Sequence, residues 1–556
     1  MRRRGIVAAN LLISMAALGL WIATARADGD HPGGNGGLQN VNHIIIVMQE
    51  NHSFDNYFGA LPYVPGGPYH QCRNQRREGK LIRTSDMGGG GGDGGDGGGG
   101  DQGNDHQCVD GLTCRVDSSG NFKCANSNLD DDGSIVQAFH EQKFCTGPDL
   151  DHSWSGSHIE ANFNDPAATI FFSPNDGFVL RNDMTTQGQP DNGPETPNSD
   201  DTMGFYTQAD LPFYYNLAEN FAIDDRYFCS VIGQTFPNRS YAAAATSFGH
   251  LTTSEILPPP GGYKPITGTI YDLLDANHVT WTNYFSDVPL SGIFRPTVFP
   301  FTTPPHVLPV STFLTQAAAG TLPSVSFVDP NLGFVFGPAT EDDEHPPTDI
   351  RKGEDFVSTV VNAVRNSVSW KDSIIFITYD EHGGFYDHVA PAPAPQHGRL
   401  NPDGIDPGQC ADLSNPPLSE TPGNGAQCTV SRMEALAICA AFTDFGAYPR
   451  DCANFDQLGF RVPFIAVSPF SRPHYVSHTV GDHTSMLALI EERFLSTHHG
   501  FSGSHLSLTE RDENADPLLD MFDFQNSPSL NTPVTTAPLA TPTDPGCPFV
   551  PNGPQG

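Results

Sequence analysis

The stretch His43-Ile44-Ile45-Ile46-Val47-Met48 is a continuous run of mostly β-branched, apolar residues. Such a run is typical of a strand that is buried on both faces, as in the centre of a parallel sheet. Residues 373–378 (SIIFIT) and 464–467 (FIAV) have the same character, and residues 325–328 and 279–284 are shorter candidates. These segments predict the central strands of a large sheet.

Apolar residues with helical spacing lie beside these strands. One set is Phe356, Val357, Val360, Val361 and Val364, and the other is Met486, Leu487, Leu489, Ile490 and Phe494. Each set forms one apolar helix face. Strands that alternate with helices predict an α/β fold with a mainly parallel sheet and helices on both faces. In such sheets, functional residues gather at the carboxyl ends of the strands.

The composition indicates a large globular domain with many loops. The chain has 556 residues, of which 37% are hydrophobic, with 37 Phe, 57 Gly and 48 Pro. There are 28 basic and 64 acidic residues, which gives a net charge of −36. This charge repels nucleic acids and anionic membranes, so we exclude a nucleic-acid-binding protein. It still allows a zwitterionic lipid or a small phosphate ester that meets a local cation.

Residues 1–27 have the pattern of a signal peptide. Three arginines follow Met1, an apolar stretch covers residues 6–23, and Ala25-Arg26-Ala27 matches a small-x-small cleavage site. The alternative is a retained membrane anchor, since the apolar stretch is slightly long for a signal peptide. We expect cleavage before Asp28 and a mature protein that is secreted or periplasmic.

The 11 cysteines agree with an oxidising destination. Five lie early and four lie late, in loop-like sequence where disulfides would restrain long insertions. Metal binding by thiolates is the alternative, but no paired C-x-x-C spacing occurs. The odd total leaves one thiol unpaired, and Cys229, in an apolar stretch, is the candidate for a buried free thiol.

We expect three parts after the signal peptide. Residues 28–526 form the catalytic domain, and residues 527–556 form a tail rich in Pro and Thr. Within the domain, residues 88–104 are a glycine-rich, flexible insertion. A calcium-binding Gly/Asp repeat is the alternative for this insertion, but the nine-residue period of such repeats is absent from its sequence.

Oxygen-bearing side chains follow the two strongest strands. Glu50 and Asn51 come after the first strand, and Asp380 and Glu381 come after residues 373–378. Carboxylate and amide oxygens that converge from separate elements suit a hard divalent cation. The alternative is that these residues cap loops or lie in solvent. Two such clusters, each at a strand end, favour the metal site.

A third segment offers a nucleophile. Gly233 permits a tight turn and Pro237 can occupy the first position of a helix. Thr235 would then lie at a helix N-terminus, where backbone N–H groups favour a phosphate. A threonine in a turn is more often only a helix cap. Arg239 adds hydrogen-bond donors, either for the phosphate or to orient the metal-binding loops.

Two of the 21 histidines lie in polar turn sequence, His152 and His345. Either could protonate a leaving alkoxide or hold a phosphoryl oxygen. Most of the other histidines, such as His498 and His499, are expected at the surface.

Taken together, these motifs resemble the phosphoesterase family of bacterial acid phosphatases and phospholipases C, which includes plant non-specific phospholipases C. The matching segments run in family order from residue 41 to residue 494: 50–55 (ENHSFD), 175–178 (NDGF), 235–239 (TFPNR), 344–346 (EHP), 380–389 (DEHGGFYDHV) and 459–463 (GFRVP) leading to Ser468-Pro469. His52 stands where the family usually has Arg, which puts only packing behind the site in doubt. The glycine-rich insertion and the early cysteines also depart from the family and leave the choice of substrate open.

The resemblance implies an alkaline-phosphatase-like fold, here with loop-rich, cysteine-containing insertions. It also implies that one divalent metal ion, of unknown identity, is held by Glu50, Asn51, Asp380, Glu381 and the nucleophile Thr235. By the same resemblance, His152 and His345 contact the phosphoryl group or act as acid and base.

The expected activity is hydrolysis of phosphoric esters. The first candidate is phospholipase C cleavage of phosphatidylcholine-like lipids through a phospho-threonine, with transient contact to a zwitterionic membrane surface. The alternative is a broad acid phosphatase that acts on small phosphomonoesters. A third hypothesis is a secreted, non-catalytic binding protein on the same scaffold, which loss of a ligand would indicate, but all four strand-end ligands are present.

Overall fold

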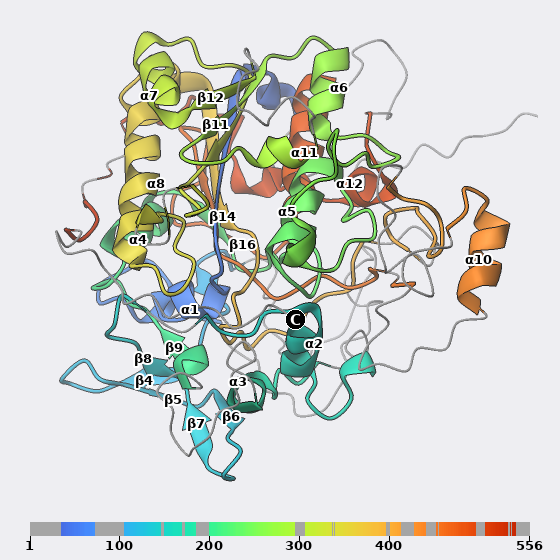
Figure 1. Ribbon diagram of the computed structural model, residues 1–556. Helices are drawn as coiled ribbons and strands as arrows, with labels where there is room; N and C mark the ends of the chain where they lie inside the picture. Colours follow the sequence, from blue (N-terminus) through green and yellow to red (C-terminus); the bar gives the residue numbers. More distant parts are fainter. Residues whose placement is uncertain are drawn as a thin grey trace, which may run out of the picture.

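A sheet of eight strands runs through the centre of the molecule (Figure 1). The computed structural model describes residues 35–72, 105–145, 149–168, 173–184, 200–294, 306–335, 337, 340–395, 401–412, 428–440, 452–453, 455–495, 506–531, 534 and 536–540. Within them, the strand order is β12-β11-β13-β1-β14-β15-β10-β16. The signal peptide and glycine-rich insertion predicted from the sequence lie outside the described residues.

Neighbouring strands of this sheet are parallel, except that β15 pairs antiparallel with β14 and β10. The strands are β1 (His43–Gln49), β10 (Ala222–Asp224), β11 (Trp281–Phe285), β12 (Val307–Pro309), β13 (Val325–Asp329), β14 (Ser373–Tyr379), β15 (Phe464–Val467) and β16 (Val476–Ser477). The mainly parallel sheet expected from the sequence is therefore confirmed. The direction of β15 was not predictable, because a buried strand is apolar whichever way it runs.

The pairing of β1 with β14 brings two distant parts of the chain together. The two strands are parallel and in register from His43 beside Ser373 to Gln49 beside Tyr379. Each strand is almost fully buried. Because both end at the same edge of the sheet, the residues that follow them lie side by side.

Helices cover both faces of the sheet (Figure 1). The helices of the described residues are α1 (Phe54–Phe58), α2 (Trp154–Ala161), α3 (Phe178–Met184), α4 (Pro212–Asn220), α5 (Thr235–Ala244), α6 (Ile270–Ala276), α7 (Val310–Ala319), α8 (Ile350–Arg365), α10 (Arg432–Ala440), α11 (His483–Ile490) and α12 (Glu510–Asn514), of which α2, α3 and α10 lie away from the faces of the sheet. Both predicted helices exist, as α8 and α11. Among the described residues, no helix combines the length and apolar character needed to cross a bilayer.

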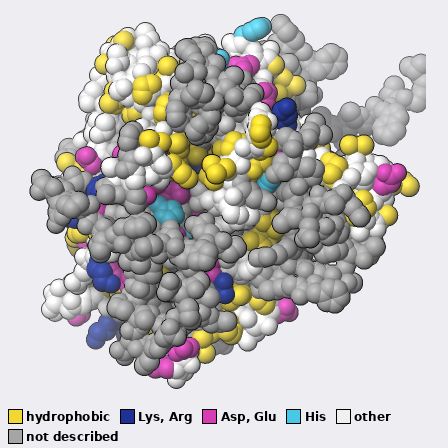
Figure 2. Space-filling model, in the orientation of Figure 1, with side chains coloured by type: hydrophobic (Ala, Val, Ile, Leu, Met, Phe, Trp, Pro, Cys, Tyr) yellow, Lys and Arg dark blue, Asp and Glu magenta, His cyan; other side chains and the backbone are white. Residues whose placement is uncertain are grey.

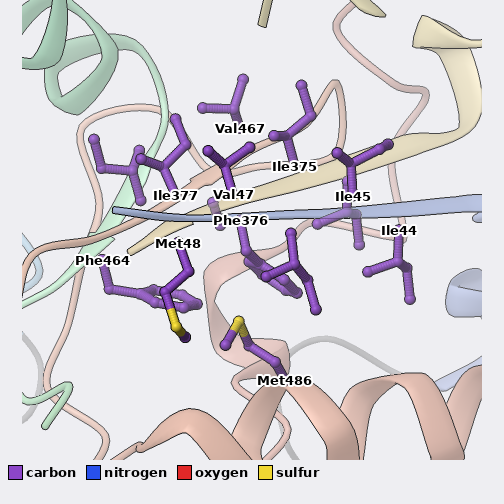
Figure 3. Packing of buried hydrophobic residues seen from close by; sticks show 14 of the residues in the cluster. Ile44, Ile45, Val47, Met48, Ile375, Phe376, Ile377, Phe464, Val467 and Met486 are labelled. Atoms are coloured by element: carbon purple, nitrogen blue, oxygen red, sulfur yellow. The ribbon is translucent and has the colours of Figure 1, made fainter. Parts of the chain in front are cut away.

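The core lies between the sheet and these helices (Figure 3). Ile45 and Val47 point to one side of β1, whereas Ile44 and Met48 point to the other, toward Met486 of α11. This alternation is the two-residue period of a strand, and here both sides are apolar because both faces are covered.

Among the described residues, the short strands that lie between β1 and β10 in the chain form four two-stranded sheets. They pair β2 (His70–Gln71) with β3 (Cys108–Val109), β4 (Cys114–Val116) with β5 (Phe122–Cys124), β6 (Ser127–Leu129) with β7 (Ile135–Gln137), and β8 (Phe139–His140) with β9 (Gly204–Phe205). These small sheets bury little apolar surface of their own, so disulfides are expected to contribute to their stability.

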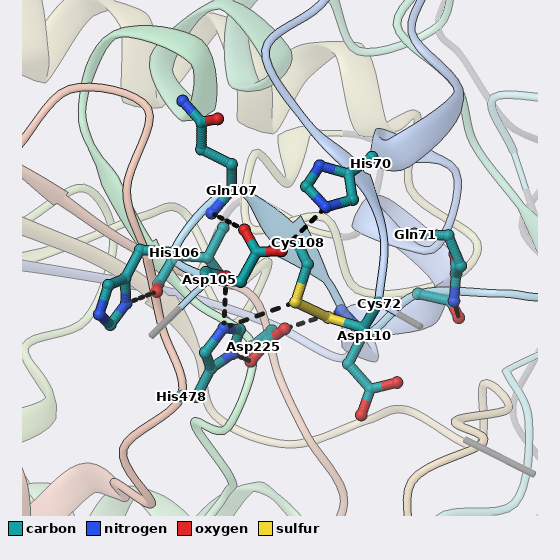
Figure 4. The surroundings of a disulfide bond; sticks show 12 residues. His70, Gln71, Cys72, Asp105, His106, Gln107, Cys108, Asp110, Asp225 and His478 are labelled. Carbon is teal, nitrogen blue, oxygen red and sulfur yellow. Dashed lines mark hydrogen bonds and ion pairs between the residues drawn. A yellow bond between two sulfur atoms is a disulfide. The ribbon is translucent and has the colours of Figure 1, made fainter. Parts of the chain in front are cut away.

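Disulfides link Cys72 to Cys108, Cys114 to Cys124, and Cys410 to Cys428, so the expected disulfides are present. Figure 4 shows the first of them beside His478, whose Nε2 lies 3.8 Å from Cys108 Sγ. His478 in turn contacts Asp225 at 2.7 Å. The early loop is thereby tied to the segment that follows β16. Cys229 is a buried free thiol, as predicted.

A buried arginine joins the loops beneath the strand ends. Arg461 is fully buried, and its guanidinium lies 3.0 Å from Asp387 and 3.1 Å from Asp55. It also donates hydrogen bonds to the carbonyl oxygens of Asp110 and Asp225. The charge of Arg461 therefore compensates carboxylates that are out of contact with water.

Replacement of this arginine by a shape-matched apolar residue should destabilise the protein strongly. We expect Arg461→Met to lower the free energy of unfolding by about 3–5 kcal/mol, because it leaves buried carboxylates uncompensated. Arg226, which is partly exposed beside Asp110, is the control, and Arg226→Met should cost about 1 kcal/mol or less. Urea unfolding measures both, and equal losses for the two variants would contradict the role given to Arg461.

Candidate active site

The residues that follow β1 and β14 meet at one edge of the sheet. The backbone N–H of Asn51 donates to Asp380 Oδ1 at 3.1 Å, and the N–H of Glu381 donates to the same oxygen at 2.8 Å. Glu50, Asn51, Asp380 and Glu381 are all at least 95% buried. The residues that the sequence places at two strand ends therefore lie side by side, and their role as metal ligands stays a prediction.

The loop after Asp380 approaches the chain at Asn51 very closely. Gly383 has a φ of +64°, and a Cβ on it would lie 2.3 Å from the carbonyl oxygen of Asn51. Only glycine has neither the steric penalty of this conformation nor the clash. Asn51 itself has a φ of 64°, so both strands leave the sheet by unusual backbone turns that set the direction of the side chains.

Several polar atoms of this group lack a hydrogen-bond partner among the described residues. They are both side-chain atoms of Asn51 and Oε1 of Glu381. A buried polar atom without a partner is costly, so such atoms indicate an absent ligand. Burial and the nearby Glu50 raise the pKa of Asp380 to about 8, although Arg239 opposes the shift. Carboxylates crowded in this way are the donor set that a hard divalent cation would hold together.

Thr235 is the first residue of α5, as predicted for a helix N-terminus. Its hydroxyl donates to Glu50 Oε2 across 3.5 Å, which places the candidate nucleophile beside the carboxylates. Pro237 is the third helical residue, not the first as its motif suggested. It still lies in the first turn, where its missing N–H leaves no intrahelical bond unmade.

Arg239 lies one helical turn after Thr235 and is buried behind the carboxylates. Its guanidinium contacts Glu50 at 2.8 Å and Asp380 at 3.2 Å. It also donates to the carbonyl oxygens of Met48 and Gln49. These contacts favour the second interpretation of this residue from the sequence, in which it orients the loops at the strand ends.

A cavity of about 290 Å³ opens beside this group. Glu50, Thr235, His152 and His345 all line it, so the two predicted histidines lie with the predicted nucleophile. The two imidazole rings are 6.1 Å apart and edge to face. His152 Nε2 lies 3.7 Å from Glu381 Oε1.

Both histidine rings are held by a hydrogen bond to a backbone carbonyl. The Nδ1–H of His152 donates to the carbonyl of Leu150 at 2.8 Å, and that of His345 donates to the carbonyl of Pro346 at 2.7 Å. These bonds fix the orientation of each ring and leave Nε2 for a ligand or a proton. Burial alone would lower the pKa of His345, but Asp149, Glu50 and Asp343 raise it to about 10. His345 can therefore donate a proton at neutral pH.

Sequence reasoning missed two acidic residues of the site. Asp149 is fully buried and lies 3.6 Å from His152 Nδ1 and 3.7 Å from His345 Nε2. Asp343 lines the cavity, and burial together with Glu50 raises its pKa well above the usual value. The signal was weak in the sequence, since each is one of several acids in its segment, two or three residues before a histidine.

His52, which replaces the usual Arg of the family motif, lies behind the site and is fully buried. Its ring stacks on Tyr57 and Phe385, at centroid distances of 4.3 and 4.9 Å. Its Nε2 is 3.0 Å from the carbonyl of Glu344, the residue before His345. Burial lowers the pKa of His52 to about 4, so it is a neutral packing residue that supports the His345 loop.

Three groups in the described chain have the spacing of metal ligands. One is Asp149, His152 and His345, a second is Asp55, Asp387 and His388, and the third combines His478 with Cys72 and Cys108, whose sulfurs form a disulfide. The second group is held by the buried charge of Arg461. The chain therefore contains side-chain groups that could hold a metal ion, and those nearest Thr235 lie around the cavity.

The chain belongs to the phosphoesterase family, whose model matches residues 41–495. This range includes the strand-end residues, Thr235 and both histidines. The chain is accordingly a hydrolase of phosphoric esters.

Curated relatives support the same class. Phospholipase C A of Mycobacterium tuberculosis is 27% identical over 93% of this chain and 84% of that protein. Phospholipase C B of the same species is 28% identical over 98% of this chain and 88% of that protein. Non-specific phospholipase C6 of Arabidopsis thaliana is 31% identical over 61% of this chain and 56% of its own length.

Solved structures show only a faint likeness. One is a protein in the alkaline phosphatase superfamily from Vibrio parahaemolyticus, with a TM-score of 0.26 and 10% identity over 51% of this chain and 60% of that chain. Another is murine ectonucleotide pyrophosphatase/phosphodiesterase 5, with a TM-score of 0.26 and 11% identity over 53% of this chain and 92% of that chain. Scores this low carry no conclusion about this chain.

The close contact at Gly383 gives a test of the site's construction. We expect Gly383→Ala to lower the free energy of unfolding by clearly more than the about 1–2 kcal/mol of left-handed strain alone, because the new methyl group meets the Asn51 carbonyl. Gly120→Ala is the matched control, since Gly120 has a φ of +84° and open space around it. Thermal or urea unfolding compares the two variants. An equal loss would show that the contact with Asn51 is unimportant.

Proposed function

We propose that this chain is a secreted, metal-dependent phospholipase C that cleaves phosphatidylcholine-like lipids through a phospho-threonine. The carrying observation is the placement of Thr235. Its hydroxyl lies at a helix N-terminus, beside Glu50, in the cavity that both histidines line. This is the arrangement that in-line attack on phosphorus requires.

The charge of the cavity supports a bound metal ion. Glu50, Glu341 and Asp343 line it together with His152 and His345, and a divalent ion would offset the repulsion between these acids and a phosphate group. The unpartnered oxygens of Asn51 and Glu381 fit one divalent ion held by Glu50, Asn51, Asp380, Glu381 and Thr235. When bound, the ion would favour the alkoxide of Thr235 and offset negative charge on the phosphoryl oxygens.

In the first step, Thr235 has released its hydroxyl proton to solvent, its Oγ bonds to phosphorus, and the bond from phosphorus to the glycerol oxygen breaks. His345 gives its Nε2 proton to that oxygen, and diacylglycerol leaves. In the second step, a water oxygen bonds to phosphorus and the water gives one proton to His345 Nε2, while the Thr235 oxygen leaves as the alkoxide. The products are a phosphorylated headgroup and free Thr235. At the start of α5, the backbone N–H of Thr235 would stabilise a phosphoryl oxygen, because the N–H of Phe236 donates to Thr253 Oγ1 and Pro237 has none.

A broad acid phosphatase is the second candidate, because the same site would accept a phosphomonoester. The names of the mycobacterial and plant relatives favour the phospholipase. Purified protein with phosphatidylcholine beside a soluble monoester separates the two. Diacylglycerol release supports the phospholipase, whereas free phosphate from the monoester alone supports the phosphatase.

Secretion is supported by the disulfides, which form in oxidising compartments. Protein recovered from the culture medium or periplasm of the producing cell should begin at Asp28. Intact residues 1–27 on a membrane-bound form would indicate the anchor instead.

Thr235→Val should abolish turnover while leaving the fold intact, because valine has the same shape and lacks the nucleophilic oxygen. The loss should be at least about 1,000-fold in kcat, measured with phosphatidylcholine and with the monoester. Thr235→Ser keeps the hydroxyl and should retain measurable activity. Rapid acid quenching of that variant should yield a phosphorylated residue 235 by mass spectrometry. Near-wild-type activity of Thr235→Val would refute the assignment.

Removal of the metal should inactivate the enzyme reversibly. EDTA is expected to abolish hydrolysis and divalent ions to restore it, and elemental analysis should find one ion per chain. Asp380→Asn should lower the metal content, whereas Asp55→Asn, in the group held by Arg461, should leave it unchanged. Full metal content in Asp380→Asn, or full activity after chelation, would contradict the proposed site.

A further inference from the structure

The cavity that contains Thr235 has an apolar wall as well as a polar one. Ile256, Leu332 and Phe334 line the apolar side. They belong to two loops, one after the short helix Thr253–Glu255 and one after β13. An amphipathic ligand would fit such a cavity better than a small polar ester would, because only a ligand with an apolar part can bury the apolar side chains of the wall.

The apolar wall continues to the surface. Leu257 follows Ile256 and is 76% exposed, while Phe334 and its neighbour Val335 are 58% and 54% exposed. We call Leu257, Phe334 and Val335 the apolar rim. Figure 2 shows hydrophobic side chains gathered across the middle of the drawn face, next to a recess with acidic and histidine side chains. Exposed apolar groups that gather at a cavity mouth mark an interaction surface.

The loop that carries two members of the rim is held in place. The backbone N–H groups of Leu332 and Val335 donate to the carboxylate of Asp287, at 3.1 and 3.4 Å. Asp287 is itself 96% buried. The loop therefore presents Phe334 and Val335 outward from a fixed backbone, which reduces the entropy lost on binding.

We propose that the apolar rim seats the enzyme on a zwitterionic phospholipid surface and directs it to aggregated lipid. This inference rests on the proposed phospholipase function and extends it to how the substrate is reached. The ester to be cleaved lies where the headgroups meet the acyl chains. A rim beside the cavity mouth that enters this boundary brings the ester within reach of Thr235.

Two observations favour a zwitterionic lipid surface over an anionic surface or a protein partner. The net charge of −36 disfavours an anionic surface, so the attraction must come from apolar contact with neutral lipid. A protein bound to the rim would cover the mouth of the catalytic cavity. A lipid surface that covers it supplies the substrate.

The test compares two double variants. Leu257→Ser with Val335→Ser removes apolar rim side chains that do not line the cavity. Val368→Ser with Leu530→Ser is the control, one Val and one Leu that are 70% and 49% exposed. Val368 lies between α8 and β14, and Leu530 accepts a hydrogen bond from Trp370, so both are at the sheet edge opposite the site.

Sedimentation with phosphatidylcholine vesicles measures binding, and hydrolysis is followed with vesicles and with short-chain phosphatidylcholine below its micelle concentration. We expect the rim variant to bind vesicles and cleave vesicle lipid at least tenfold less well than wild type. Its activity on the monomeric lipid should stay within twofold. The control variant should match wild type in all three measurements.

Equal vesicle binding by rim variant and wild type would overturn the proposal, as would an equal loss of activity on monomeric and vesicle lipid. If wild type binds vesicles through the rim but cleaves no phosphatidylcholine, the rim stands and the proposed phospholipase function fails. If wild type cleaves monomeric lipid but does not bind vesicles, the function stands and the rim proposal fails.

Discussion

The parallel pairing of β1 with β14 is the constraint on which the site depends. Over seven residue pairs, apolar contacts on both faces hold the two strands in one register, so Glu50 and Asp380 emerge as neighbours. A shift of one residue would exchange the side chains between the two buried faces, so that each would meet different packing partners, and it would break the hydrogen bond from the Asn51 N–H to Asp380. The arrangement of the site residues is thus held mainly by apolar packing in the core, which contains none of those residues.

Burying several carboxylates close together is electrostatically unfavourable, and two buried arginines offset this cost at two places in the structure. At the strand ends, Arg239 contacts both Glu50 and Asp380, and a divalent ion is proposed to complete the compensation. Beneath the strand ends, Arg461 does the same for Asp55 and Asp387. The two arginines have no exposed charge to offer a substrate, so their contribution is to keep acidic loops in place.

Around this rigid centre, the loops supply what a substrate would meet. His152 and His345 come from two different loops, their rings lie 6.1 Å apart, and a backbone carbonyl anchors each ring. The apolar wall comes from two other loops, which reach the surface at Leu257 and Phe334. A polar centre with an apolar wall is consistent with a phosphoric ester that carries hydrocarbon, and family membership places the chemistry at phosphorus.

The sequence by itself determined the buried strands, the helix faces of α8 and α11, the free Cys229 and the candidate residues at the ends of β1 and β14. It could do so because hydrophobic period and strand-end position are local properties. Only the tertiary structure decided the antiparallel direction of β15, the buried role of Arg239, and the inclusion of Asp149 and Asp343 beside the histidines. These features depend on which distant segments fold against one another. The local sequence around an acid or an arginine in a loop is the same whether that side chain contacts water or a buried carboxylate.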